Sequence, residues 1–387
     1  MTDERLKIAD RITPIPDGPD RVHLHSWTQS LALVGRADRI FQALIPLLDG
    51  GRTGAEIVAA LERYGRDEVA AVLDDLMKAG IVEPCDPAQS RRSAGERAQV
   101  AFFSQFALPA ELAEAATPRG LARSGAEYQQ RLAEARIAVF GAGRIGARLA
   151  EGLAVSGAGH LTVIDAAPVG AEDLGGEASF GEADLGMPRV EALKRRCAAA
   201  VPGMTFRGIA EAPGEAALEA VLAASSFAVL CPDAHDPGLF ERVNRVALKH
   251  GLPWTSARSL GLEFRIGPTI LPGETPCYEC FRLRIASNAP SESAHRLIED
   301  FQRGAALKPV ALAVTPGVDL LLLEVVKAIT WFAAPSCYGH LYTLDLMTME
   351  GRRHPVLKIP RCPACGRPAS GRPTIHAWQQ ARPEPGG

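Results

Sequence analysis

The sequence lacks the features that would direct a chain to a membrane or to a polyanion. Its first residues are charged from Asp3 onward and have no apolar core, which predicts no secretory signal. The most apolar stretch, residues 318–334, carries Asp319, Glu324 and Lys327, whereas a membrane-spanning helix needs about 20 mostly apolar residues. The net charge is −3, so no basic excess points to nucleic acid or acidic lipid. These absences predict a cytoplasmic protein in which residues 318–334 form a helix of the core or of a subunit interface.

What the sequence does have is an ordinary globular composition and eight cysteines. Apolar residues make up 47% and charged residues 22% of 387, enough for a large core and about two domains. In a reducing compartment, eight cysteines favour metal ligands or free thiols over disulfides. The polar residues 86–100 are typical of a linker. Together with a lead-in to residue 124, they would separate a small N-terminal unit from a longer α/β region.

The small unit, residues 1–85, has the pattern of a hairpin followed by three helices. Short extended runs predict a hairpin of residues 21–27 and 30–35. Apolar periodicity predicts helices over residues 37–48, 53–64 and 67–79, the second opened by a Thr53–Glu56 capping box. This order predicts a winged-helix-like α+β domain.

The charge of this unit argues against DNA as its ligand. Residues 1–85 contain ten Lys and Arg against fourteen Asp and Glu, a net of −4, and the third helix is acidic. Phosphate contacts dominate DNA affinity, so an acidic helix would be repelled by the backbone of the duplex. Two interpretations stay open. An apolar helix face beside an extended strand can accept a peptide by strand addition, or the unit is a structural appendage.

The hairpin, the segment DGGRT (49–53) and a last helix ending in KAGIV (78–82) resemble the PqqD-like precursor-peptide recognition module over roughly residues 10–85. The resemblance implies that the leader of a ribosomally made peptide binds as an added strand between the last strand and the last helix. Some residues of that surface must face the core instead. Carried over to this sequence, the peptide-binding residues are Leu31, Ala32, Leu33, Val34, Val69, Val72, Leu73 and Leu76.

The longer region opens with a nucleotide-type βαβ unit. A strand over residues 137–140 precedes the turn GAGRIG (141–146), and a helix and a second strand lead to Asp165, nineteen residues after Gly146. Glycines at 141, 143 and 146 permit a tight turn and close approach to phosphate, and the acid can hold a ribose. The pattern predicts a Rossmann-like fold. Whether a nucleotide still binds is a separate question, because a fold can outlive its ligand.

Four of the eight cysteines form two knuckles, Cys277-x-x-Cys280 and Cys362-x-x-Cys365, separated by 81 residues. Each knuckle offers two thiolates on one turn, and two knuckles complete a closed tetrahedral zinc site. The alternative is a set of buried or redox-active cysteines. A closed site has no open position for catalysis, so zinc would hold the C-terminal segment on the core.

The glycine turn, Asp165, the segment GPTILPGETPCYEC (267–280) and the terminal CPACG (362–366) together resemble the ThiF/MoeB superfamily, relatives of ubiquitin-activating enzymes. The resemblance covers about residues 125–370 and leaves 371–387 as a C-terminal tail. It implies an α/β Rossmann-like core that binds ATP and magnesium, adenylates a C-terminal carboxylate, forms a homodimer and carries a zinc ion held by four cysteines. It also implies that Asp233 is the magnesium ligand and that Arg189 stands where the family has a phosphate-binding lysine.

The sequence departs from that family at three places. The family's Asn-Leu-x-Arg-Gln stretch is replaced by DLGGEASF (173–180), which has no arginine and carries Glu177. Arg144 occupies a turn position that is glycine in the family, where it would crowd or replace a phosphate. Residues 285–314 contain no cysteine, and Cys337 is the free thiol nearest in sequence. Thioester transfer is therefore not expected.

The whole chain resembles the ThiF-like partner proteins of peptide azole biosynthesis. Such a partner binds a precursor's leader and presents its core to a separate YcaO-type cyclodehydratase, as in bacteriocin production. We therefore predict a non-catalytic, leader-binding partner whose nucleotide site, formed by Gly141, Gly143, Gly146 and Asp165, is inherited. The alternative is an ATP-dependent enzyme that adenylates or cyclises a precursor peptide directly, with Asp233 and Arg189 in its active site. An NAD-dependent enzyme fits less well, because of the cysteine knuckles.

Overall fold

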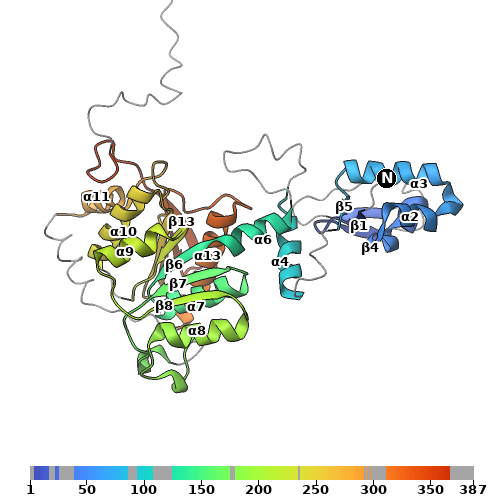
Figure 1. The fold of residues 1–387 in the computed structure, drawn as a ribbon. Helices are drawn as coiled ribbons and strands as arrows, with labels where there is room; N and C mark the ends of the chain where they lie inside the picture. The colour runs from blue at the N-terminus through green and yellow to red at the C-terminus, as the bar shows by residue number, and fades with distance from the viewer. Residues whose placement is uncertain are drawn as a thin grey trace, which may run out of the picture. The chain divides into compact units, whose positions relative to one another are not determined.

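The computed structural model describes residues 4–16, 22–25, 39–85, 94–107, 124–174, 179–233, 236–291, 293, 297 and 311–366. The chain divides into two compact units. The first comprises residues 1–135, 152–160 and 322–335, and the second comprises residues 136–151, 161–321 and 336–387. Figure 1 shows the helices and strands of each unit.

The N-terminal part of the first unit is a three-stranded sheet with three helices. The sheet has the order β4-β1-β5, so that β1 (Arg5–Ile8) pairs antiparallel with both β4 (Asp49–Thr53) and β5 (Val82–Pro84). The helices are α1 (Arg39–Leu44), α2 (Gly54–Ala60) and α3 (Arg66–Lys78), with 3-10 turns at Ile45–Leu47 and Glu62–Tyr64. The three predicted helices are confirmed, the first two with shorter bounds and the third moved by one residue. The capping box is confirmed too, since the Thr53 side chain accepts from the backbone N–H of Glu56.

The predicted hairpin is only partly described. Strand β3 (Val22–His25) lies inside the predicted run, but it pairs with β2 (Thr13–Pro16), which the sequence did not single out. The predicted second strand, residues 30–35, lies outside the described residues, and so do Leu31, Ala32, Leu33 and Val34. Strands β1, β4 and β5 were also not predicted, because runs of three to five residues are too short to show a clear alternation.

Helix α3 directs most of its apolar side chains into the core of this small sheet. Val69 is 0% and Leu73 is 4% exposed, and both pack with Leu6 of β1 and Ile57 of α2. These two residues are core residues, which corrects their prediction as a peptide-binding surface. Val72 and Leu76 are only partly buried. Leu76 also contacts the cluster formed by Val22, Leu24, Phe41 and Ile81, which joins α3 to β3.

The stretch predicted to be a linker contains the beginning of a helix. Residues 94–104 form α4, which packs side by side with α6 (Gly125–Glu134). Among the described residues of that stretch, Glu96 and Arg97 are exposed, whereas Val100 and Phe103 are buried, with the ring of Phe103 against that of Tyr128. The two helices approach closely at Gly125, where a Cβ atom would lie 2.1 Å from the backbone oxygen of Val100.

The second unit is built on an eight-stranded sheet of order β13-β12-β11-β10-β9-β6-β7-β8. Strands β6 and β9, and β9 and β10, pair parallel, and β10 to β13 pair antiparallel as a meander. The strands span Arg136–Phe140 (β6), His160–Ile164 (β7), Thr205–Ile209 (β8), Phe227–Leu230 (β9), Trp254–Leu260 (β10), Glu263–Ile266 (β11), His340–Asp345 (β12) and Glu350–Pro355 (β13). The Rossmann-like α/β fold predicted from the sequence is confirmed.

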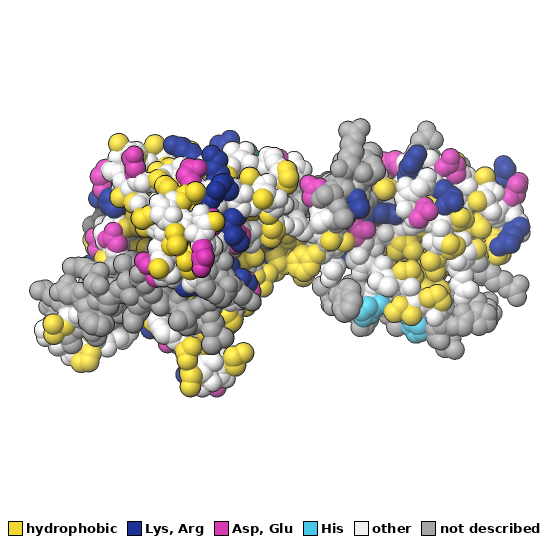
Figure 2. Space-filling model, turned by 90° about the horizontal axis from the view of Figure 1, so that it is seen from below, with side chains coloured by type: hydrophobic (Ala, Val, Ile, Leu, Met, Phe, Trp, Pro, Cys, Tyr) yellow, Lys and Arg dark blue, Asp and Glu magenta, His cyan; other side chains and the backbone are white. Residues whose placement is uncertain are grey.

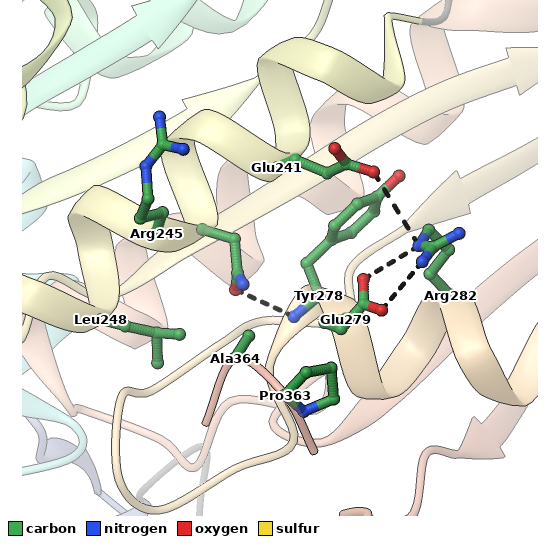
Figure 3. Close-up of a pocket in the computed structure, with 9 residues that line it drawn as sticks. Glu241, Arg245, Leu248, Tyr278, Glu279, Arg282, Pro363 and Ala364 are labelled. Atoms are coloured by element: carbon green, nitrogen blue, oxygen red, sulfur yellow. Dashed lines mark hydrogen bonds and ion pairs between the residues drawn. The ribbon is translucent and has the colours of Figure 1, made fainter. Parts of the chain in front are cut away.

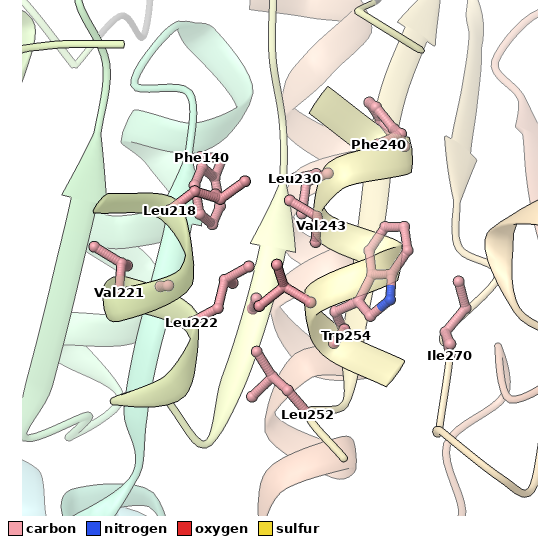
Figure 4. Close-up of a cluster of buried hydrophobic side chains, with 14 of the residues drawn as sticks. Phe140, Leu218, Val221, Leu222, Leu230, Phe240, Val243, Leu252, Trp254 and Ile270 are labelled. Atoms are coloured by element: carbon pink, nitrogen blue, oxygen red, sulfur yellow. The ribbon is translucent and has the colours of Figure 1, made fainter. Parts of the chain in front are cut away.

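Helices connect and cover these strands. They are α7 (Arg144–Val155), α8 (Arg189–Ala200), α9 (Glu215–Ala223), α10 (Pro237–His250), α11 (Tyr278–Asn288) and α13 (Ala311–Thr330). Figure 4 shows the core between the sheet and helices α9 and α10, where Leu222 and Val243 pack against Phe140, Leu230 and Trp254. This core fixes the carboxyl ends of β6 and β9 side by side.

Residues 318–330, most of the apolar stretch, lie in α13, where Val318 and Leu321 are 1% and 0% exposed. Among the described residues, none of the helices is long and apolar enough to cross a membrane. Basic and acidic side chains are interspersed on the face seen in Figure 2, in agreement with the small net charge.

Candidate functional site

The glycine turn lies at the point where the sheet reverses its strand order. Strand β6 continues through α7 to β7 on one side, while β9 lies on its other side, with Phe140 opposite Leu230. In open α/β sheets, ligands bind at such a switch point, outside the carboxyl ends of the strands. The Rossmann-like turn and Asp233, three residues after the end of β9, therefore meet where a nucleotide-type ligand is expected.

The protein's own packing already requires the three glycines of the turn. A Cβ atom at Gly141, whose φ is +96°, would lie 2.3 Å from the backbone oxygen of Cys231, and one at Gly146 would lie 1.8 Å from the oxygen of Gly141. At Gly143 it would lie 1.8 Å from Oδ1 of Asp233. Close approach to phosphate is thus not needed to explain the motif, because the turn packs directly against the segment after β9.

Gly143→Ala tests this packing. We expect the added methyl group to displace the Asp233 carboxylate and to lower the free energy of unfolding by about 1–3 kcal/mol, the usual cost of overpacking. Gly181→Ala is a suitable control, since a Cβ atom there meets nothing within 4 Å. The measurement is denaturant unfolding of both variants. Equal stability of the two would show that Asp233 does not lie against the turn.

Arg189, the first residue of α8, joins three carboxylates beside the turn. Its Nε and Nη2 donate to the two oxygens of Asp173 at 2.9 and 2.8 Å, a bidentate pair. Its Nη1 donates to Oδ2 of Asp233 at 2.7 Å and lies 3.4 Å from Oδ2 of Asp165. The side chains of Arg189 and Asp173 are only 7% and 5% exposed, whereas that of Asp233 is 33% exposed. The cluster is open to solvent at Asp233.

The charges of this cluster do not balance. Burial by itself would lower the pKa of Arg189, but Asp233, the hydrogen bond to Asp173, and Asp165 together hold it above the usual arginine value. Burial raises the pKa of Asp233, and Asp165 and Asp173 raise it further, against the opposing effect of Arg189. One guanidinium facing three carboxylates leaves an excess of negative charge. Such a site attracts a further cation.

Two other predicted residues also bind the chain itself. Asp165 accepts from the backbone N–H groups of Ala142 and Ala167, at 2.6 and 2.8 Å, and so ties the glycine turn to the end of β7. Arg144 donates to the carbonyl oxygens of Glu172 and Leu174, at 2.7 and 3.0 Å. Arg144 therefore holds the 3-10 turn of residues 171–173 against α7.

Asp173 is the residue of this cluster that the sequence did not single out. It lies in the stretch noted only for its missing arginine, sixteen positions before Arg189. Its charge could have identified it, since a buried arginine at the start of a helix requires a carboxylate partner. Glu177 lies outside the described residues.

The four knuckle cysteines come together as predicted. Cys277 and Cys280 lie at the start of α11, and their sulfur atoms are 3.9 Å apart. Cys277 lies 3.7 Å from Cys362, and Cys280 lies 3.6 Å from Cys365. All four sulfur atoms lie within 4.8 Å of one another.

This geometry fits a metal ion and excludes disulfides. Sulfur atoms in a disulfide are about 2.05 Å apart. A tetrahedral zinc ion with Zn–S bonds of about 2.3 Å places its four sulfurs about 3.8 Å from one another, and the three closest pairs lie at 3.6 to 3.9 Å. The four cysteines can therefore hold one metal ion in a closed site.

A pocket of about 520 Å³ lies beside this cluster, between α10, α11 and the second knuckle (Figure 3). Its charged groups neutralise one another. Arg282 donates to both oxygens of Glu279 at 2.8 and 2.9 Å and lies 3.9 Å from Glu241. Asn244 accepts from the backbone N–H of Tyr278 at 3.0 Å. We assign this pocket no ligand, since its polar side chains are already engaged.

Comparison with known proteins covers the region that contains the Arg189 cluster and the four cysteines. The model of the ThiF family matches residues 117–365. The Salmonella typhimurium molybdopterin-synthase adenylyltransferase is 24% identical over 243 residues, which are 62% of this chain and 91% of that protein. The Bacillus subtilis sulfur carrier protein ThiS adenylyltransferase is 26% identical over 247 residues, 62% of this chain and 68% of that protein.

Solved structures extend the likeness to more of the chain. The microcin C7 biosynthetic enzyme MccB in complex with N-formylated MccA superposes with a TM-score of 0.67 at 18% identity, over 93% of this chain and 99% of that one. Escherichia coli MccB with ATP gives a TM-score of 0.66 at 17% identity, over 94% and 99%. PaaA gives 0.68 at 19% identity, over 90% and 100%. At these identities the likeness establishes the fold.

Proposed function

Because the chain belongs to the ThiF family, we propose that it is an ATP-dependent enzyme that adenylates a carboxylate of a ribosomally made precursor peptide. The observation that carries the proposal is the cluster of Asp165, Asp173 and Asp233 around Arg189, directly against the glycine turn. The sequence alone favoured a non-catalytic partner. The intact cluster, together with the names of the relatives and structural neighbours, supports the alternative instead.

The cluster fits a magnesium nucleotide by the chemistry of its donors. Carboxylate oxygens are the ligands that magnesium prefers, and a divalent cation would balance the excess negative charge. Asp233 would hold the metal, because it is the most exposed of the three carboxylates. Asp165, beside the turn, would hold the ribose. When bound, magnesium would supply charge stabilisation at the phosphates.

Asp173 gives Arg189 a defined role in this proposal. Its bidentate pairing occupies Nε and Nη2 of Arg189 and leaves Nη1 directed at Asp233. If Asp233 turned to a bound metal ion, Nη1 of Arg189 would keep its contact with Asp165 and could also donate to a phosphate oxygen. Arg189 would then stabilise the charge that develops when the peptide carboxylate bonds to the α-phosphorus and pyrophosphate leaves. Asp173 would act as its positioning residue.

The test is ATP–pyrophosphate exchange with synthetic peptide pools. We expect the full chain to exchange labelled pyrophosphate into ATP when it is given randomised heptapeptides with free carboxylates, and not when every carboxylate is amidated. Exchange should be lost when magnesium is chelated. ATP-independent peptide binding without any exchange would contradict the proposal.

A second function is favoured by one specific observation. Arg189 and Arg144, the two arginines beside the turn, both donate hydrogen bonds to the chain itself. A chain in this state would suit a partner that binds a leader peptide and presents its core to a YcaO-type cyclodehydratase. Azoline formation that needs both proteins, with exchange absent from this one, would establish this second function.

We further propose that the N-terminal part is a PqqD-like, winged-helix peptide-recognition domain of residues 1–85, followed by the ThiF-like domain of residues 125–370. Strand β3 packs against α3 through Leu24 and Leu76, so the two elements that the resemblance assigns to peptide binding lie side by side. Several of the similar solved structures contain MccB together with MccA, which supports a peptide as the ligand. The homodimer and the zinc ion implied by the family resemblance belong to the same proposal.

Val72→Glu tests this recognition surface. Val72 is partly buried on α3 and lies one residue from the exposed Ala71. A buried carboxylate would repel an apolar leader segment, so we expect Val72→Glu to weaken leader-peptide binding at least tenfold. Ala71→Glu adds the same charge to the same helix and should leave affinity within about twofold. The measurement is fluorescence anisotropy of a labelled peptide with the full chain. Equal loss in both variants would indicate a non-specific charge effect.

A further inference from the structure

Strands β10 and β11 place two arginines directly opposite each other. In the antiparallel register Arg258 pairs with Arg265, and the same row continues through Thr343 to Arg352 on β13. Side chains in such cross-strand pairs have Cβ atoms about 4.5–5.5 Å apart, and like charges at this distance destabilise a sheet. The row therefore needs negative charge from another source.

Two of the three arginines in the row have a carboxylate of their own. Arg265 pairs with Glu263, and Arg352 pairs with Glu350 at 2.6 Å. Arg258 has no such partner among the residues that the structure describes, although it is partly buried. Burial lowers the pKa of Arg258 below the usual arginine value, and repulsion from Arg265 lowers it further. A partly buried guanidinium without a carboxylate partner can still donate hydrogen bonds to an oxyanion.

The position of Arg258 relates it to the proposed adenylation site. Ser256 of β10 pairs with Leu230 of the parallel strand β9. Arg258 comes two residues after Ser256, and Asp233 comes three residues after Leu230. Both residues thus lie at the same edge of the sheet, on neighbouring strands. The glycine turn and Arg189 follow β6 and β7, on the other side of β9. A nucleotide at the turn would therefore lie on the β6 and β7 side of Asp233, and Arg258 lies on its β10 side.

We propose that Arg258 and Arg265 form an oxyanion site that binds an acidic side chain of the substrate peptide, next to the carboxylate that is activated. The proposal rests on the proposed peptide-adenylating function. Arginine suits the role because its planar fork matches a carboxylate with two parallel hydrogen bonds. The site would make the enzyme select precursors that carry Asp or Glu close to the modified residue.

Exchange with paired peptide pools tests the selectivity. Each heptapeptide pool is randomised except at one fixed position. In one set of pools this position holds Glu and in the other set Gln, and the fixed position is moved along the peptide from pool to pool. We expect at least tenfold faster ATP–pyrophosphate exchange with the Glu pool at one position. In Arg258→Gln, the exchange rate with the Glu pool should fall to the rate with the Gln pool. The rate with the Gln pool should stay the same as in wild type. Arg195→Gln, which removes an exposed arginine paired with Asp184, should preserve the preference. Equal loss with both pools in Arg258→Gln would overturn the proposal.

A second measurement separates the site from the adenylation activity. The full chain labelled with 15N-arginine is titrated with N-acetyl-glutamate α-amide, with N-acetyl-glutamine α-amide and with pyrophosphate. The Arg258 Nε–Hε signal is identified by its absence in Arg258→Gln. We expect it to shift with the glutamate compound alone, even if the chain shows no exchange with any peptide. A shift with pyrophosphate alone would assign Arg258 to the nucleotide, and no shift with any probe would show that there is no oxyanion site. Either result would overturn the proposal.

Discussion

Asp233→Asn should abolish ATP–pyrophosphate exchange while leaving the fold at least as stable as before. The side chain is the proposed metal ligand, and it is the exposed member of the cluster around Arg189. An amide offers magnesium one neutral oxygen in place of a carboxylate. We expect exchange to fall by about 10²–10³-fold, the usual effect of removing one electrostatic element from an active site.

The stability expectation follows from the direction of the Asp233 pKa. Burial and the neighbouring carboxylates raise this pKa above its ordinary value of 3.8, so the folded protein holds the proton more tightly than the unfolded chain does. Between 3.8 and the raised value, stability therefore falls as pH rises, and above it the ionised group is a net cost. An asparagine resembles the protonated form. We expect Asp233→Asn to unfold at the same or higher denaturant concentration than wild type at pH 7 without nucleotide.

The comparison needs a variant that removes a carboxylate elsewhere. Glu215→Gln removes an exposed carboxylate paired with the exposed Arg245 and should change neither exchange nor stability by much. A gain in stability with loss of exchange would identify Asp233 as a functional residue held at the expense of the fold. Full exchange in Asp233→Asn would show that the metal is held elsewhere. Marked destabilisation would show that Asp233 is chiefly a structural partner of Arg189.

The sequence predicts the Rossmann-like core well because that core depends on local, periodic patterns. The strand over residues 137–140, the helix after the glycine turn and the second strand before Asp165 appear as expected. Paired Cys-x-x-Cys motifs likewise identify their partner across 81 residues, since a tetrahedral site needs four thiolates. The periodic pattern and the paired cysteine motifs can both be recognised without knowledge of tertiary contacts.

What the sequence could not show depends on contacts between distant segments. The linker prediction for residues 86–100 is wrong beyond residue 93, because burial of Val100 and Phe103 against α6 decides the helix there. Val69 and Leu73 follow the same periodicity as Val72, and only the packing of β1 and α2 assigns them to the core. The pairing of Arg189 with Asp173 depends on how α8 packs against the turn of residues 171–173, and the position of Arg258 opposite Arg265 depends on sheet register. Single-sequence patterns determine neither.

Cys365→Ser should remove the metal from the second unit and destabilise it strongly. Cys365 is the least buried of the four ligands, so the substitution itself costs little packing. The loss of one thiolate opens the tetrahedron, and zinc binding in small closed sites is worth about 10–16 kcal/mol. We expect metal content to fall from about one equivalent of zinc to well below one. The temperature of unfolding should fall by roughly ten degrees or more.

In Cys365→Ser, the loss of stability should begin where the two Cys-x-x-Cys knuckles meet. The second knuckle is held against α11 by the cysteine cluster and by the backbone N–H of Ile359, which lies 3.4 Å from the sulfur of Cys280. Hydrogen exchange in Cys365→Ser should therefore increase first in residues 359–366 and in the first turn of α11. Cys197→Ala removes a buried cysteine outside the cluster and should retain the metal, with a loss of about 1–2 kcal/mol. Wild-type protein without metal, or with an unfolding temperature unaffected by a chelator, would contradict a structural zinc ion.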